Sequence, residues 1–222
     1  EGLQDAINNG LPLLLLYVME PSLEENPHYH KRHHNFIAQS LVALNGALKQ
    51  FDTQVHVYKN EVLEVLNSIQ DSMKINTLFS MQETGLNATY DRDKAVKKWC
   101  VSKRIVWKEH INNGVTRGIK NRNNWRNTWT SYMMQPIKPF EASAASFTTA
   151  DCIGLTEEVL EPKKLEGIQA GGTKTGLAYL ESFLSQRHKK YQQSISKPEA
   201  ARTHCGRVSP YIAWGNLSVR YV

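Results

Sequence analysis

The chain has 222 residues, 41% of them hydrophobic and 22% charged, which is a balance typical of globular proteins. This composition excludes collagen-like, mucin-like and fully disordered chains. The cysteines Cys100, Cys152 and Cys205 lie far apart, and no zinc-finger spacing of Cys and His occurs. We therefore expect no disulfide scaffold and no bound metal, but reduced thiols in a cytoplasmic protein.

The longest apolar run, Leu11 to Met19, has nine residues, whereas a helix that crosses a bilayer needs about 20. Glu1 and Asp5 precede this run, in place of the basic residues that open a signal peptide. We therefore expect a soluble protein with no membrane partner.

Charge is distributed unevenly along the chain. Residues 1–90 carry 10 acidic and 5 basic side chains, while residues 91–222 carry 11 acidic and 22 basic ones, within a net charge of +6. A basic half beside an acidic half indicates a face that meets a polyanion, although a solvated basic surface explains the charge equally well.

The first half of the chain alternates helical patterns with short apolar strands. The predicted strands cover residues 11–19, 54–58, 76–81 and 104–107. The predicted helices cover residues 2–9, 27–51, 61–74 and 89–103, and the longer ones repeat apolar residues at three- and four-residue steps. Such alternation predicts an α/β fold with a doubly wound parallel sheet.

The predicted order begins with a helix, whereas such domains normally begin with a strand that lies centrally in the sheet. We expect the first strand to be missing, so that two strand edges inside the sheet are unpaired. The last segment also stops in mid-pattern. The sequence is therefore expected to be truncated at both ends, and the 222-residue chain alone to be inactive and prone to aggregation.

The regular pattern fails between residues 134 and 170, where three prolines and an Ala/Ser/Thr-rich stretch over 141–150 indicate an interdomain linker. Thr173 is the predicted N-cap of a helix that runs to about Gln193. The predicted domains are an α/β domain over 1–133, the linker over 134–170 and the start of a helical domain over 171–222.

Two clusters have a structural and a functional interpretation. His28, His30, His33 and His34 crowd the start of a helix, but no carboxylate lies at a spacing that would complete a metal site. Basic residues over 103–126 are interleaved with tryptophans, as in polyanion-binding surfaces. We expect Trp125 and Trp129, four residues apart, to face a core instead, and leave the basic residues open.

The segment from Cys205 to Arg220, with the letters CGRVSPYIAWGNLSVR, is the most distinctive in the chain. A small residue, an arginine and a serine before a helix offer backbone N–H groups, a cation and a hydroxyl to a phosphate. Across residues 205–222 this segment resembles the flavin-binding motif of the DNA photolyase/cryptochrome family. The resemblance continues upstream in order, at residues 11–21, 32–41, 82–85 (QETG), 90–93 (YDRD), 99–100, 114–125 and Tyr191.

The resemblance implies a Rossmann-like α/β domain that can hold an antenna chromophore of folate or deazaflavin type, followed by an all-α domain that binds FAD. It implies that the flavin phosphates contact Tyr191, Cys205, Gly206, Arg207, Val208 and Ser209. Cys205 and Gly206 replace the family's commoner hydroxyl pair, which implies weaker phosphate binding at the same place. The catalytic residues would lie after Val222.

The function implied for the complete protein is that of a monomeric, blue-light-driven photolyase that splits pyrimidine dimers in damaged DNA. Two alternatives stay open at this point. One is a cryptochrome-like blue-light receptor without repair activity, and the other is a small nucleotide-binding α/β module unrelated to light.

Overall fold

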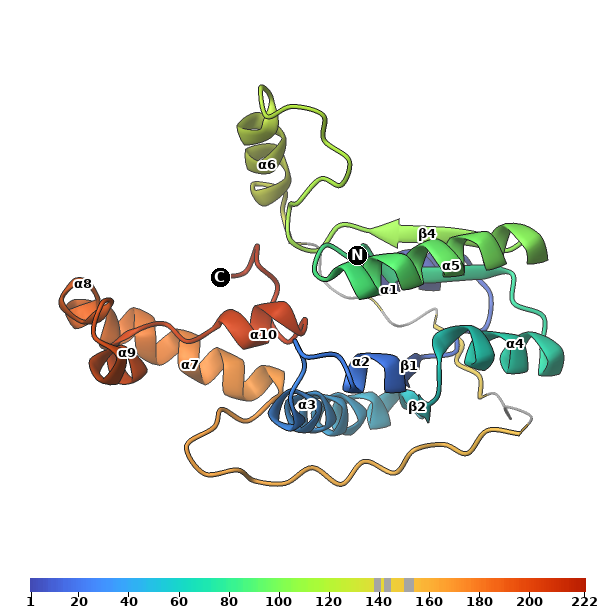
Figure 1. Ribbon diagram of the computed structural model, residues 1–222, viewed down its shortest axis with the longest axis horizontal. Helices are drawn as coiled ribbons and strands as arrows, with labels where there is room; N and C mark the ends of the chain where they lie inside the picture. Colours follow the sequence, from blue (N-terminus) through green and yellow to red (C-terminus); the bar gives the residue numbers. More distant parts are fainter. Residues whose placement is uncertain (138–140, 142–144, 150–153) are drawn as a thin grey trace. The chain divides into compact units, whose positions relative to one another are not determined.

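The structure, a computed structural model, describes residues 1–137, 141, 145–149 and 154–222 (Figure 1). Its contacts divide the chain into two compact units. Unit 1 comprises Glu1–His30 and Leu48–Val159, and unit 2 comprises Lys31–Ala47 and Leu160–Val222. Pro139, Cys152 and part of the Ala/Ser/Thr-rich stretch over 141–150 lie outside the described residues. Within the described ranges, no helix combines the length and the apolar character needed to cross a membrane.

Unit 1 contains four parallel strands arranged in two pairs. β1 (Leu16–Met19) pairs with β2 (His56–Lys59), with Leu16 opposite His56. β3 (Thr77–Met81) pairs with β4 (Val106–His110), with Thr77 opposite Val106. The described strands thus form two two-stranded sheets, with no pairing between β1 and β3. The α/β class with parallel strands is confirmed. That a first strand is missing between the two pairs stays a prediction.

The helices of unit 1 are α1 (Gly2–Asn8), α2 (Pro21–Glu24), α4 (Val62–Ser72), α5 (Asn87–Lys103) and α6 (Trp125–Met133), with a 3₁₀ turn at Lys49–Phe51. Of these helices, α1, α4 and α5 contain buried residues, whereas α2 and α6 contain none. α4 contributes Val65, Leu66 and Ile69, all at most 2% exposed. Leu66 packs with Trp99 and Cys100 of α5, and the Trp99 indole N–H donates to Asn67 Oδ1 at 2.8 Å. This packing fixes α5 against α4.

Several predicted ends were wrong for local reasons. The first strand was predicted over residues 11–19 but begins at Leu16, because Leu13 forms an isolated bridge with Phe147 in place of a pairing with β2. The helix expected from Pro27 begins only at Lys31, because Asn26 accepts from the backbone N–H of His28 and Tyr29 in a turn. The strand expected from Arg104 begins at Val106, because Arg104 ends α5 in a left-handed conformation.

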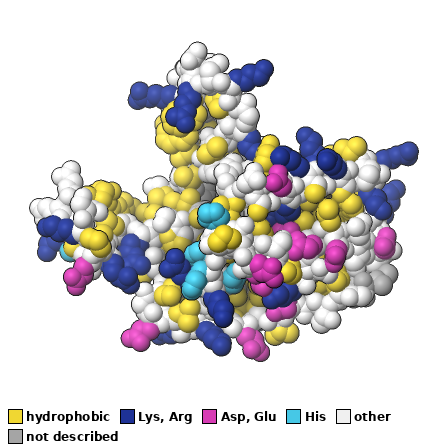
Figure 2. Space-filling model, in the orientation of Figure 1, with side chains coloured by type: hydrophobic (Ala, Val, Ile, Leu, Met, Phe, Trp, Pro, Cys, Tyr) yellow, Lys and Arg dark blue, Asp and Glu magenta, His cyan; other side chains and the backbone are white. Residues whose placement is uncertain are grey.

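α6 corrects the prediction for the tryptophans. Trp125 and Trp129 stack on each other, with ring centroids 6.3 Å apart, but they are 43% and 38% exposed and do not face a core. α6 packs on its own connecting loop, where Gly114 lies against Trp129 and the Tyr132 hydroxyl donates to Ile111 O. In Figure 2, Lys and Arg side chains surround this segment at the top of the view.

Unit 2 is helical and joins α3 (Lys31–Leu48) to the C-terminal segment. Its other elements are α7 (Thr173–Ser185), a 3₁₀ turn at Arg187–Lys190, α8 (Tyr191–Ser194), α9 (Pro198–His204) and α10 (Ser209–Ala213). The core is Phe36, Tyr211 and Leu217, with Tyr211 fully buried. The Tyr211 hydroxyl donates to Ala170 O at 2.8 Å. Burial raises the pKa of Tyr211, which keeps this hydroxyl protonated.

The start and end of α7 also differ from the prediction. The N-cap of α7 is Gly172 and not Thr173. The backbone at this position has a φ of +107°, which glycine adopts readily and residues with a Cβ adopt only with strain. The helix ends at Ser185 instead of Gln193, since Gln186 leaves helical geometry. The chain therefore turns at Arg187 and brings Tyr191 back toward the distinctive segment 205–209.

Candidate functional site

The residues predicted to hold flavin phosphate lie together in unit 2. The side chain of Phe183, on α7, lies against both parts of the set. Its ring meets the Tyr191 ring edge to face, with centroids 5.8 Å apart, and a Cβ placed on Gly206 would lie 3.8 Å from it. The structure thus brings Tyr191 and Gly206 to the same side chain, although 14 residues separate them in sequence.

The backbone of the segment has the geometry of an anion-binding concavity. Arg207 has a left-handed φ of 56°, and Val208 follows in right-handed geometry with φ −89° and ψ −9°. Alternating hands of this kind turn successive N–H groups toward one point. Within the described residues, the backbone N–H groups of residues 206–209 donate no hydrogen bond. These donors therefore fit the oxygen atoms of a phosphate.

The side chains of the segment divide into anchoring and open positions. The Arg207 guanidinium donates from Nε to Gln169 Oε1 at 3.2 Å and from Nη1 to Arg202 O at 3.1 Å. Gln169 donates in return to Arg207 O. Val208 packs against the Tyr211 core, whereas Ser209 is exposed at the start of α10. Arg207 is thus held by neutral oxygen atoms, and its charge has no carboxylate partner in the described part of the chain.

Two further arginines adjoin the segment, and sequence reasoning missed both. Arg202 donates to Gly167 O at 3.0 Å. Arg187 donates to backbone carbonyls of the segment, including Gly206 O at 3.3 Å. Among the described residues neither pairs with a carboxylate. The basic run over 187–190 is the sequence signal that could have pointed to Arg187. Three guanidinium groups whose partners are neutral give the segment a positive potential.

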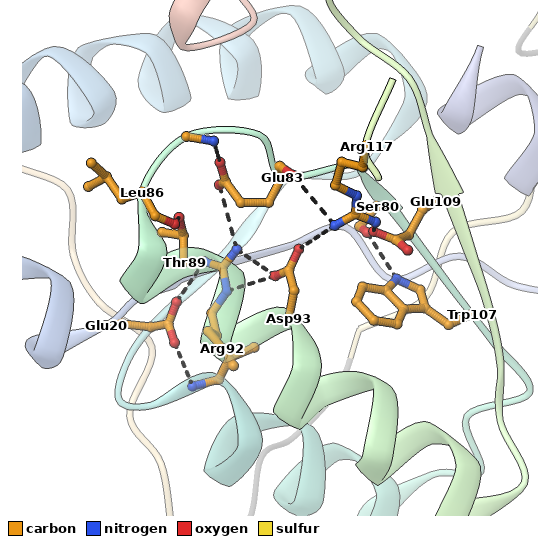
Figure 3. Close-up of polar contacts among 12 residues, drawn as sticks. Glu20, Ser80, Glu83, Leu86, Thr89, Arg92, Asp93, Trp107, Glu109 and Arg117 are labelled. Carbon is orange, nitrogen blue, oxygen red and sulfur yellow. Dashed lines mark hydrogen bonds and ion pairs between the residues drawn. The ribbon is translucent and has the colours of Figure 1, made fainter. Parts of the chain in front are cut away.

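A second polar cluster lies in unit 1, where β1, β3 and β4 end (Figure 3). Arg92, on α5, donates from Nη1 to Glu20 Oε1 at 3.0 Å and from Nη2 to Asp93 Oδ1 at 2.9 Å. Arg117, on the loop after β4, pairs with Glu109 and approaches Asp93 at 3.8 Å. The two arginines therefore link residues from α5, the strand ends and this loop into one network.

Burial dominates the electrostatics of this network. Glu20 is 5% exposed and Asp93 7%. Loss of solvent raises the pKa of Glu20 and of Asp93, while their hydrogen bonds to Arg92 act in the opposite direction. Tyr17, on β1, is also desolvated, and its pKa is raised to about 12. The cluster holds four carboxylates, Glu20, Glu83, Asp93 and Glu109, against two arginines.

A pocket of about 400 Å³ opens beside this cluster. It lies between the segments that follow β3 and β4, and its polar lining includes Glu83, Tyr90 and Arg117. Glu83 folds back to accept from the Gly85 backbone N–H. Ring systems with N–H donors suit a pocket that offers carboxylate acceptors and an aromatic wall. The sequence marked Glu83 and Arg92 only as part of a resemblance and gave them no role.

Solved structures similar to the chain come from both branches of one family. An archaeal photolyase from Sulfolobus tokodaii, solved with two FAD molecules, has a TM-score of 0.73 at 20% identity. A cryptochrome from Synechocystis has a TM-score of 0.72 at 18% identity, and a bacterial class III photolyase from Agrobacterium tumefaciens 0.74 at 17%. Each match covers 99% of this chain and 50%, 50% and 48% of the respective structure. The chain thus spans about half the length of these relatives.

The family model described as DNA photolyase matches residues 1–144, which is more than half of the chain. No match was found among curated proteins. Together with the parallel α/β unit and the helices that follow it, the match shows that this chain belongs to the DNA photolyase family.

Proposed function

We propose that the protein binds FAD in unit 2, with the pyrophosphate over residues 205–209 and Tyr191 beside it. Two observations in one segment support this proposal. The backbone N–H groups of residues 206–209 donate no hydrogen bond within the described residues, and three arginines that adjoin the segment have no carboxylate partner there. A pyrophosphate supplies the negative charge and acceptor oxygen atoms that this arrangement lacks. The residues present therefore fit the phosphate end of the cofactor.

The chemistry we propose is the light-driven cleavage of pyrimidine dimers in DNA. When bound and reduced, FAD that has absorbed blue light supplies an electron to such a dimer. The residues of this chain have the tasks of binding and orientation. The N–H groups of residues 206–209 neutralise phosphate charge, and the buried Tyr211 holds α10 in place through Ala170.

The binding proposal is tested by FAD titration of the protein and of two variants. Arg207→Gln removes one guanidinium from the segment and is expected to weaken FAD binding about tenfold or more, as the loss of a charge-assisted contact does. Lys197→Gln is the matched control, because it removes one positive charge from an exposed position of the same unit. Equal FAD affinity of all three proteins would contradict the proposal.

Repair activity distinguishes a photolyase from a cryptochrome-like receptor, and we propose that the complete protein has it. We expect the complete protein to reduce the number of pyrimidine dimers in ultraviolet-irradiated DNA under blue light and not in the dark. Flavin binding with light-induced spectral change but without dimer loss would favour the photoreceptor. Binding of a nucleotide without binding of flavin would favour the other alternative, a nucleotide-binding α/β module unrelated to light.

We propose in addition that the pocket of unit 1 holds an antenna chromophore of folate or deazaflavin type. Its place at the carboxyl ends of β3 and β4 is where ligands bind in open α/β sheets. Glu83 offers a carboxylate to ring N–H groups, and Tyr90 offers an aromatic wall. Replacing Tyr90 by Ala is expected to remove near-ultraviolet or blue absorbance that is not due to FAD, while FAD content stays unchanged.

A further inference from the structure

Arg187 joins three parts of unit 2 that are distant in sequence. Its Nε donates to Ser182 Oγ at 3.1 Å and its Nη2 to Tyr179 O, both on α7. Nη1 donates to Cys205 O, and Nη2 also reaches Gly206 O at 3.3 Å. The guanidinium therefore ties the end of α7 to the two residues that precede Arg207.

The same guanidinium lies against two aromatic rings. Its central carbon is 5.7 Å from the ring centroids of Tyr179 and of Phe183. Phe183 is also the ring that contacts Tyr191 and lies closest to Gly206. Cation–π contacts of this kind restrict the plane of the guanidinium, so its donors are aimed at the Cys205 and Gly206 carbonyls.

Fixing these carbonyls also fixes the N–H groups on the opposite side. A trans peptide unit is planar, so its C=O and the N–H of the next residue point in opposite directions. When Arg187 holds Cys205 O and Gly206 O on one side, the N–H groups of Gly206 and Arg207 must point to the other. These are two of the N–H groups that donate no hydrogen bond within the described residues.

We propose that Arg187 is a positioning residue of the flavin-phosphate site: it holds the 205–206 peptides so that their N–H groups face the pyrophosphate, without touching the cofactor itself. This inference rests on the proposed FAD binding. Lysine cannot replace it, because a single ammonium group lacks the planar fork that serves Tyr179, Cys205 and Gly206 at once.

The experiment compares Arg187→Gln and Arg187→Lys with two controls. Lys189→Gln removes a neighbouring exposed charge from the same 3₁₀ turn. Leu180→Val weakens the core of α7 at a residue that is 7% exposed and reports on a merely structural loss. FAD affinity is measured under conditions in which every variant is folded, and the NMR order parameters of the residue 206 and 207 amides are measured in the absence of FAD.

We expect both Arg187 variants to bind FAD about tenfold or more weakly, which is the effect of losing hydrogen bonds from a charged donor. Without FAD, their 206–207 amides should have lower order parameters than in the wild type, while both controls match the wild type in affinity and in these order parameters. Unchanged affinity or unchanged order parameters in Arg187→Gln would overturn the inference, as would equal weakening in Leu180→Val.

The two measurements separate this inference from the proposed function. If the wild type binds no FAD, the proposed function fails and with it the role at a flavin site. The order parameters of the 206–207 amides then still decide whether Arg187 fixes the 205–206 peptides. If the wild type binds FAD and the Arg187 variants bind it equally well, only the positioning role fails.

Discussion

Gly176 of α7 lies directly beneath the ring of Tyr211. A Cβ at Gly176 would come within 2.9 Å of two Tyr211 ring carbons and 3.2 Å of Leu217. Tyr211 is fully buried and cannot move aside without disturbing Phe36, whose ring centroid is 5.3 Å away. The absence of a side chain at this one helical position therefore allows α7 and α10 to pack together.

Gly176→Ala is expected to lower the free energy of unfolding of unit 2 by about 1 to 3 kcal/mol, the usual effect of overpacking a core. Gly46→Ala is the matched control, since Gly46 also lies within a helix but nothing approaches its Cβ position within 4 Å. That change should stabilise α3 by up to about 1 kcal/mol. Chemical denaturation of both variants measures the difference, and equal stability would mean that α10 does not pack on Gly176.

Gly206→Ser is expected to tighten FAD binding severalfold. The new Cβ meets Phe183 only at 3.8 Å, an ordinary contact, and the added hydroxyl can donate to a phosphate oxygen. Gly206→Ala adds the same Cβ without the hydroxyl and should leave the affinity unchanged. Flavin titration of the three proteins decides the matter. An equal gain in both variants would attribute the effect to backbone restriction and not to a hydroxyl–phosphate contact.

Arg92→Met is expected to destabilise unit 1 by about 2 to 3 kcal/mol. The change leaves the buried carboxylates of Glu20 and Asp93 without their shared donor, although the effect is reduced because the Arg92 side chain is 29% exposed. Lys94→Met, on the same helix, removes an exposed ion pair with Asp91 and should leave the stability of unit 1 essentially unchanged, because solvent screens such a pair.

The double variant Arg92→Met/Glu20→Gln provides a further check on this network. Glu20→Gln neutralises one of the two carboxylates that Arg92→Met leaves unpaired, so the double variant should recover part of the lost stability. Thermal unfolding at neutral pH measures all four proteins. Additive losses in the double variant would show that Arg92 and Glu20 do not interact in solution.

Tyr17 makes the stability of unit 1 depend on pH in the alkaline range. Its pKa is raised from 10.0 to about 12, chiefly by burial, so the folded state holds the phenolic proton more tightly than the unfolded state does. The associated stability is present below pH 10 and is lost as the pH rises from about 10 toward 12. Tyr17→Phe should lower the slope of unfolding free energy against pH in that window and leave the slope near pH 8 unchanged.

The order of elements in this protein could be read from the sequence, whereas several of their ends could not. Apolar periodicity located all four strands and the four helices among them, because burial of one face is a local requirement. The end of α5 at Arg104 and the start of α7 at Gly172 depend on left-handed or otherwise positive φ values. Packing and turns determine such conformations, and the spacing of apolar residues does not predict them.

The candidate site was also only partly visible in the sequence. Tyr191 and the segment 205–209 could be named from their chemistry and their order. Arg187 and Arg202 could not, because basic residues are common on protein surfaces and nothing local distinguishes a guanidinium that binds backbone carbonyls. The same holds for Arg92, which became significant only when the fold placed it between Glu20 and Asp93.

The sequence by itself determined the α/β class and the family likeness, since both follow from local residue types and their spacing. It also named the candidate segment 205–209, but only the tertiary structure decided which groups converge on that segment. Tyr179, Arg187 and Gly206 meet because α7 ends at Ser185 and the chain turns back. Contacts between residues distant in sequence arise from packing, and packing is a property of the whole folded unit.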